Sequence, residues 1–119
     1  MGQRRRRIPD DSPSDAQAEL AQLRTRYRRE LPDKIGAVKE AAAAALGAVH
    51  DRQEIEALHL LVHRLVGSAA IYGFGAVSEV AATMEAFVVE ILEAASPPSG
   101  LWRQRLESLV AALERAAAG

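Results

Sequence analysis

The sequence has 119 residues, 49% of them hydrophobic, and its 15 basic and 16 acidic residues nearly cancel to a formal net charge of −1. This length fits one domain, and the balanced charge gives no support to a chain-wide role on nucleic acid or on a membrane surface. The absence of cysteine excludes disulfides, thiolate metal sites and thiol catalysis. Since no apolar run approaches the ~18 residues of a membrane span, we expect a cytoplasmic protein.

Residues 1–14 are predicted to form a disordered tail in front of a single domain at 15–119. The tail carries the run of arginines from Arg4 to Arg7, followed by prolines and aspartates. None of these residues can bury apolar surface, and no apolar segment typical of a secretory signal follows the arginines. We therefore interpret the tail as solvated, with an electrostatic handle as the alternative.

The first predicted helix is short and runs from Ser14 or Asp15 to about Glu30. Asp15 is a good N-cap residue. Apolar residues recur behind it at helical spacing: Leu20, Leu23, Tyr27 and Leu31. Because proline is tolerated in the first turn of a helix and not in its interior, Pro32 is expected to interrupt this helix. A second helix then starts near 31–33 and continues to about 47–50.

Three further helices are predicted, over about residues 51–72, 76–95 and 101–117. Asp51 is the N-cap candidate of the third, Gly73 and Gly75 end it, and the Ser-Pro-Pro-Ser-Gly segment 96–100 separates the last two. The expected inward residues are Val77, Val80, Ala81, Met84, Val88 and Ile91 in the fourth helix and Leu106, Leu109, Val110 and Leu113 in the fifth. This pattern predicts an all-α, antiparallel up-down four-helix bundle, with the short additional N-terminal helix packed across one end.

The third helix carries a histidine beside its buried stripe. The stripe residues step by three and four: Ile55, Leu58, Val62, Leu65 and Ala69. At roughly 100° per residue, His63 falls roughly 120° from the centre of this stripe, whereas His59 lies nearer the edge of the core. A neutral imidazole nitrogen is nucleophilic near physiological pH and forms covalent intermediates, so His63 is the candidate nucleophile.

Gly67 lies one turn after His63, on the exposed side. Glycine inside a helix costs roughly 1 kcal/mol relative to alanine, which this sequence uses freely. Because helical side chains lean toward the N-terminus, a side chain at position 67 would cover His63. We interpret Gly67 as an opening for a partner; the alternative is close packing against another helix.

An exposed apolar row beside His63 is the candidate docking surface. Leu60, Arg64, Gly67 and Ile71 follow at i, i+4, i+7 and i+11. There are two alternatives. Leu60 and Ile71 are single exposed apolar residues of the ordinary kind, or the first helix covers Leu60.

Glu85 is the candidate carboxylate for holding the second ring nitrogen of His63. It follows Met84 at the edge of the stripe of the fourth helix, where it can face the third helix, whereas Glu79 and Glu90 are expected to face solvent. Such a hydrogen bond would fix the tautomer of the imidazole.

The stretch from His63 to Phe74 resembles the motif of histidine-containing phosphotransfer (HPt) domains. The shared features are the histidine, an aliphatic residue, Gly67, two small residues and a second glycine, Gly73, about ten positions after the histidine. The pairs Gly73-Phe74 and Met84-Glu85 are similar to those in the phosphotransfer domains of chemotaxis-type histidine kinases. The resemblance covers about residues 15–118.

The resemblance implies a four-helix bundle in which His63 is phosphorylated on its outward nitrogen and Glu85 hydrogen-bonds its ring. The receiver-docking residues would be Leu60, Arg64, Gly67, Ser68 and Ile71. The lysine that usually stands three positions after the histidine is Val66 here, which puts the transfer rate or the choice of partner in question.

The resemblance also implies the pathway and the partners. The chain would accept a phosphoryl group from a receiver aspartate of a hybrid histidine kinase and pass it to the receiver domain of a response regulator. The expected protein is a monomer without a cofactor or an ATP-dependent kinase activity of its own. Mg²⁺ is expected on the partner receiver.

Three alternative functions stay open. His59 and His63 have the i, i+4 spacing of a zinc-binding pair, with His50 and Glu56 as weak candidates for a third ligand. A second alternative is a receiver-docking module that inhibits or sequesters a response regulator without being phosphorylated. The third is a purely structural or oligomerising bundle.

Overall fold

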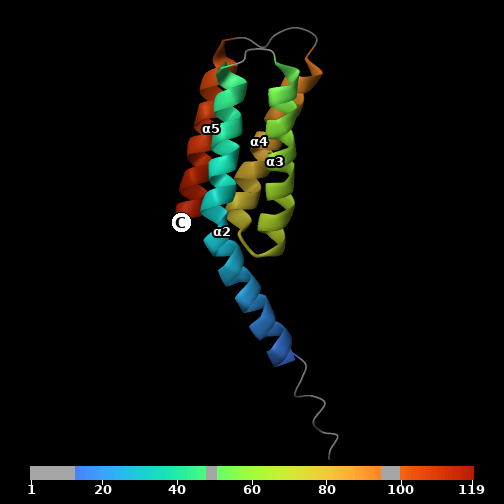
Figure 1. The fold of residues 1–119 in the computed structure, drawn as a ribbon, viewed down its shortest axis with the longest axis vertical. Coiled ribbons are helices and arrows are strands. Elements are labelled where there is room, and N and C mark those ends of the chain that lie inside the picture. The colour runs from blue at the N-terminus through green and yellow to red at the C-terminus, as the bar shows by residue number, and fades with distance from the viewer. Residues whose placement is uncertain (1–12, 48–50, 95–99) are drawn as a thin grey trace, which may run out of the picture.

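A computed structural model describes residues 13–47, 51–94 and 100–119 of the chain. These residues form four helices, α2 (Pro13–Gly47), α3 (Arg52–Ile71), α4 (Gly75–Glu93) and α5 (Leu101–Ala118), and contain no strand. The helices run alternately up and down (Figure 1), and α2 closes the ring by packing against both α3 and α5. The predicted all-α four-helix bundle is confirmed.

Each helix buries one stripe of side chains in the common core. In α3 the buried residues are the five predicted ones: Ile55, Leu58, Val62, Leu65 and Ala69. In α4 and α5 they are Val77, Ala81, Met84, Val88, Trp102, Leu106, Val110 and Leu113. Val80, Ile91 and Leu109 are half-buried at the edges of these stripes, and the burial of Trp102 was not predicted. The helical period therefore predicted which face of α3, α4 and α5 is buried.

The predicted break at Pro32 is wrong, because α2 is one continuous helix of 35 residues with Pro32 in its interior. Pro32 lies on the exposed side, whereas Leu31 and Ile35 are buried in the core. Water can satisfy the carbonyl that the missing N–H of Pro32 leaves free, while core packing on the other side keeps the helix continuous.

The expectation that the first helical segment packs across one end of the bundle is also wrong. The N-terminal part of α2 instead projects beyond the bundle (Figure 1), and every residue from 15 to 26 is exposed, including Leu20 and Leu23. Tyr27 and Leu31 are the first residues of this stripe to be buried. The apolar stripe thus starts before the part of α2 that the bundle covers.

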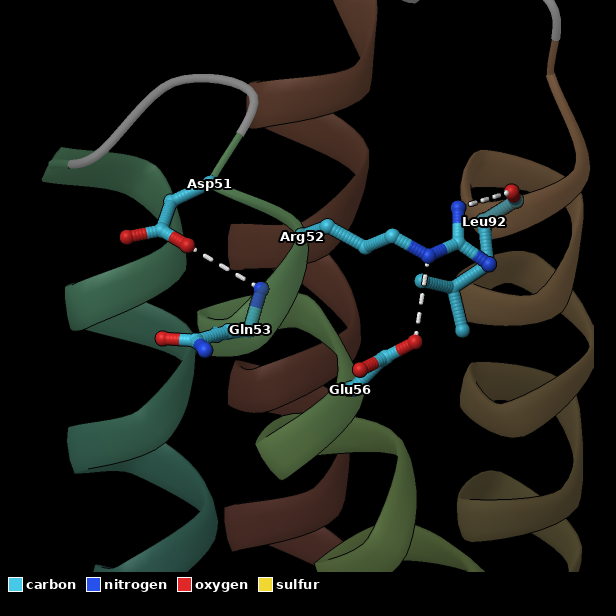
Figure 2. A network of polar contacts seen from close by, with 5 residues as sticks. All are labelled: Asp51, Arg52, Gln53, Glu56 and Leu92. Carbon is cyan, nitrogen blue, oxygen red and sulfur yellow. Dashed lines mark hydrogen bonds and ion pairs between the residues drawn. The ribbon is translucent and has the colours of Figure 1, made fainter.

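The ends of α3 follow the predicted capping chemistry. Asp51 is the N-cap, and its Oδ1 accepts a hydrogen bond of 3.0 Å from the backbone N–H of Gln53 (Figure 2). Beside it, Arg52 donates to the backbone carbonyl of Leu92 at 2.9 Å and to Glu56 at 3.1 Å, which ties the start of α3 to the end of α4.

Gly73 ends α3 in the left-handed conformation, with φ of 85°. Its N–H donates to the carbonyl of Ala70 at 3.2 Å, and the N–H of Phe74 donates to the carbonyl of Ala69 at 2.7 Å. This pair of hydrogen bonds is the Schellman motif, which favours glycine at this position. The Ser78 hydroxyl, near the start of α4, donates to the carbonyl of Val66 at 2.8 Å and fixes α4 against α3.

Several predictions fall outside the described residues. These are the tail over residues 1–12, His50, and the proline-containing segment 96–99, whereas residues 13 and 14 of the predicted tail belong to α2. In the described part of the chain, no helix is both long enough and apolar enough to cross a membrane.

Candidate functional site

His63 projects from the flank of α3, as its position beside the buried stripe predicted. Its side chain is 65% exposed, although its neighbour Val62 is fully buried. An exposed imidazole on a rigid, core-packed helix is accessible to a protein partner and is held in a defined place.

Glu85, on α4, contacts the ring of His63 across the interface of α3 and α4. Its Oε2 lies 2.6 Å from Nδ1 of His63, which is a short hydrogen bond. Because the carboxylate accepts, Nδ1 carries the hydrogen and the lone pair of the neutral ring lies on Nε2. The nitrogen that can act as a nucleophile is therefore the one not facing Glu85.

His59 contacts the same carboxylate. This contact was not predicted from the sequence. Nε2 of His59 lies 3.3 Å from Oε2 of Glu85, and the rings of His59 and His63 stack with their centroids 5.9 Å apart. The i, i+4 spacing of the two histidines was visible in the sequence, but it suggested a metal pair. The rotation of α4 that brings Glu85 into contact with both rings cannot be deduced from the pattern of α3.

Gly67 has open space around it. A Cβ atom built at this position meets no other heavy atom within 4 Å, beyond its immediate neighbours and the backbone of its own helix. The alternative that Gly67 permits close packing against another helix is therefore wrong for the described residues. The absence of a side chain keeps the surface beside His63 open.

The apolar row next to His63 is exposed, as predicted. Leu60 is 47% and Ile71 is 70% exposed, and Arg64 lies between them on the same side of α3. The alternative that the first helix covers Leu60 is wrong, because the N-terminal part of α2 projects away from the bundle.

Ser68 differs from the rest of the predicted docking surface. It is half-buried on the side of α3 that faces α2, and its Oγ lies 2.7 Å from the hydroxyl of Tyr27. A groove between α2 and α3 is lined by Lys34, Leu61, Arg64 and Ser68, among others. Ser68 thus joins α3 to α2 and borders the exposed row from the groove.

Tyr27 anchors α2 to the end of α3. Its ring stacks on Tyr72 with centroids 4.9 Å apart and lies 5.3 Å from the ring of Phe74. Burial raises the pKa of the Tyr27 phenol above its ordinary value, and the hydrogen bond with Ser68 opposes part of this rise. The phenol is therefore neutral and available for the contact with Ser68.

The structure gives no support to the two weak candidates for a third zinc ligand. Glu56 pairs with Arg52, and His50 lies outside the described residues. Within residues 13–47, 51–94 and 100–119, no three histidine, cysteine, aspartate or glutamate side chains form a group able to hold a metal ion.

A family model described as the Hpt domain matches residues 22–118. The matched range contains α3, α4, α5 and the part of α2 that packs in the bundle. No match was found among curated proteins or among solved structures.

Proposed function

Because this chain belongs to the Hpt domain family, whose domains carry out histidine phosphotransfer in phosphorelay signalling, we propose that His63 is its phosphoryl acceptor. In this proposal, the donor is the phosphorylated receiver domain of a hybrid histidine kinase. The recipient is the receiver domain of a response regulator.

The observation that carries the proposal is the contact of Glu85 with Nδ1 of the exposed His63. During transfer, Nε2 forms a bond to phosphorus while the bond from phosphorus to the oxygen of the receiver aspartate breaks, releasing the aspartate carboxylate. Nδ1 keeps its hydrogen, so the phosphorylated ring carries a positive charge. The Glu85 carboxylate stabilises this charge where it develops.

The receiver is proposed to dock on the exposed side of α3. Leu60, Arg64 and Ile71 surround the opening at Gly67, and they offer apolar contact around one positive charge. Ser68 supports this side of the helix through its contact with Tyr27. The receiver would supply the aspartyl phosphate and the Mg²⁺ that neutralises the phosphoryl charge.

The test is uptake of acid-labile, base-stable phosphate from receiver domains phosphorylated with acetyl phosphate and Mg²⁺. Wild type, His63→Gln and His59→Gln are compared. We expect label on wild type and on His59→Gln but none on His63→Gln, because His63 presents the nitrogen that does not face Glu85 from a side chain that is 65% exposed, whereas the side chain of His59 is 33% exposed.

Two results would overturn the proposal. Label that persists in His63→Gln would move the acceptor to another residue. Receivers that bind the wild type without labelling it would instead favour a docking module that sequesters a response regulator.

A further inference from the structure

One carboxylate oxygen serves both histidines of α3. Oε2 of Glu85 lies 2.6 Å from Nδ1 of His63 and 3.3 Å from Nε2 of His59. The two rings stack with an interplanar angle of 25°. His59 is therefore linked to the ring of His63 through Glu85, on the side away from the nucleophilic nitrogen.

A second polar contact on this oxygen restricts the carboxylate. A glutamate side chain has several rotatable bonds, and a single contact with an exposed imidazole leaves much of this freedom in place. The carboxylate oxygen has two lone pairs, and it meets Nδ1 of His63 in a hydrogen bond and Nε2 of His59 at 3.3 Å. The contact with His59 therefore holds the Glu85 side chain in place in advance. Less conformational entropy is then lost when Glu85 binds Nδ1 of His63.

Packing alone does not explain a histidine at position 59. The residue is half-buried at the edge of the core, where a leucine would bury more apolar surface without a polar group to satisfy. The polar end of His59 instead faces Glu85. The titratable groups that the structure places against His59 are Glu85 on α4 and His63 on its own helix.

We propose that His59 is a positioning residue, which holds the Glu85 carboxylate against Nδ1 of His63 and so favours the tautomer whose Nε2 takes the phosphoryl group. This inference rests on the proposed role of His63 as the acceptor. His59 itself does not touch the phosphoryl group.

The first test reads the tautomer of His63 directly, without a partner. Protein labelled with ¹⁵N in its histidine rings is compared by NMR at a pH where His63 is neutral, as wild type, His59→Leu and His59→Gln. We expect the Nδ1–H tautomer of His63 to dominate in wild type and to lose population in His59→Leu. His59→Gln should retain more of it, because the glutamine amide still offers an N–H to Glu85.

The second test measures phosphoryl transfer in a double-mutant cycle. We expect His59→Leu to slow transfer from a phosphorylated receiver about fivefold in the wild-type background and to have no further effect in Glu85→Ala. Circular dichroism melting of each variant identifies any loss of folding.

Two outcomes overturn the proposal: an unchanged His63 tautomer in His59→Leu, or an equal slowing of transfer with and without Glu85. Failure of the proposed function gives a different result, because wild type would then take up no phosphate. The NMR comparison would still decide whether His59 positions Glu85.

Discussion

Nδ1 of His63 and Oε2 of Glu85 lie 2.6 Å apart, and this contact joins α3 to α4 at the surface of the bundle. Glu85→Ala removes the acceptor for the Nδ1 hydrogen, whereas Glu85→Gln keeps a neutral acceptor. We expect Glu85→Ala to slow phosphoryl transfer to His63 about tenfold, which corresponds to about 1.4 kcal/mol, and Glu85→Gln to slow it less. Single-turnover transfer from a phosphorylated receiver measures both rates.

The matched control for Glu85 is Glu90→Ala, which removes an exposed carboxylate from the same helix. Transfer should be unchanged in this control, and the free energy of unfolding of either alanine variant should stay within about 0.5 kcal/mol of wild type. Unfolding of Glu85→Ala would assign Glu85 a structural role and contradict its role in orienting His63.

Gly67→Ala is expected to change stability and transfer in opposite directions. An added Cβ meets nothing within the fold, so alanine should raise the free energy of unfolding by about 1 kcal/mol through its higher helix propensity. The same methyl group occupies space that the docked receiver would use, so transfer should slow, and Gly67→Gln should slow it further. Chemical denaturation and transfer rates give the two quantities.

Gly36→Ala is the control for this prediction. Gly36 also lies inside a helix, α2, and a Cβ built there meets nothing within 4 Å. It should stabilise the fold by a similar amount without affecting transfer. Equal transfer rates for wild type and Gly67→Gln would show that the receiver does not approach this position.

The sequence predicted the features that depend on one helix at a time. Periodicity placed the buried stripe of α3, the exposure of His63 and the exposed side of Gly67, because each depends only on rotation about a single axis. Capping chemistry predicted the ends of α3 at Asp51 and Gly73, because the required side chain or backbone conformation is local.

Most features that depend on two helices were not predicted. The contact of Glu85 with His63 was expected from the edge position of Glu85 and from the family resemblance. The additional contact of Glu85 with His59 requires the exact register of α4 against α3, and the Tyr27–Ser68 hydrogen bond requires that of α2 against α3. No single-helix pattern contains these registers. At Pro32 a local rule predicted a break, and tertiary packing overrode it.

Tyr27→Phe is expected to destabilise the protein and to change its response to alkaline pH. At neutral pH the loss of the hydrogen bond to Ser68 should cost about 1 kcal/mol. Burial raises the pKa of the Tyr27 phenol above 10.0, so the unfolded chain releases this proton at a lower pH than the folded one. The stabilisation that the protonated Tyr27 phenol gives the folded state is complete below about pH 10. It is lost as the pH rises through the pKa of this phenol in the folded state.

Urea denaturation of wild type and Tyr27→Phe between pH 8 and pH 11 tests the direction of this pH dependence. The advantage of wild type should shrink as the pH rises, and the contributions of Tyr72 and the lysines cancel because both proteins contain them. A constant difference across this range would contradict the effect of burial on the Tyr27 phenol.

Pro32→Ala is expected to stabilise the protein, because α2 continues through this position. Alanine restores an N–H that can donate to the carbonyl of Arg28, and it removes the clash of the proline ring with that carbonyl. An interior proline costs ~3 kcal/mol relative to alanine. Since Pro32 lies on the exposed side, where water and slight bending relieve part of this cost, we expect a gain of about 2 kcal/mol in the free energy of unfolding.

The Pro32→Ala substitution also distinguishes two structures: one continuous helix α2, or two helices that meet at the proline. If a second helix began at Pro32, the proline would occupy a first-turn position, where its missing N–H costs nothing and its fixed φ is favourable. Alanine would then be neutral or destabilising. Urea denaturation of wild type and Pro32→Ala distinguishes the two cases, with Glu40→Ala, another exposed position of α2, as the control for helix propensity alone.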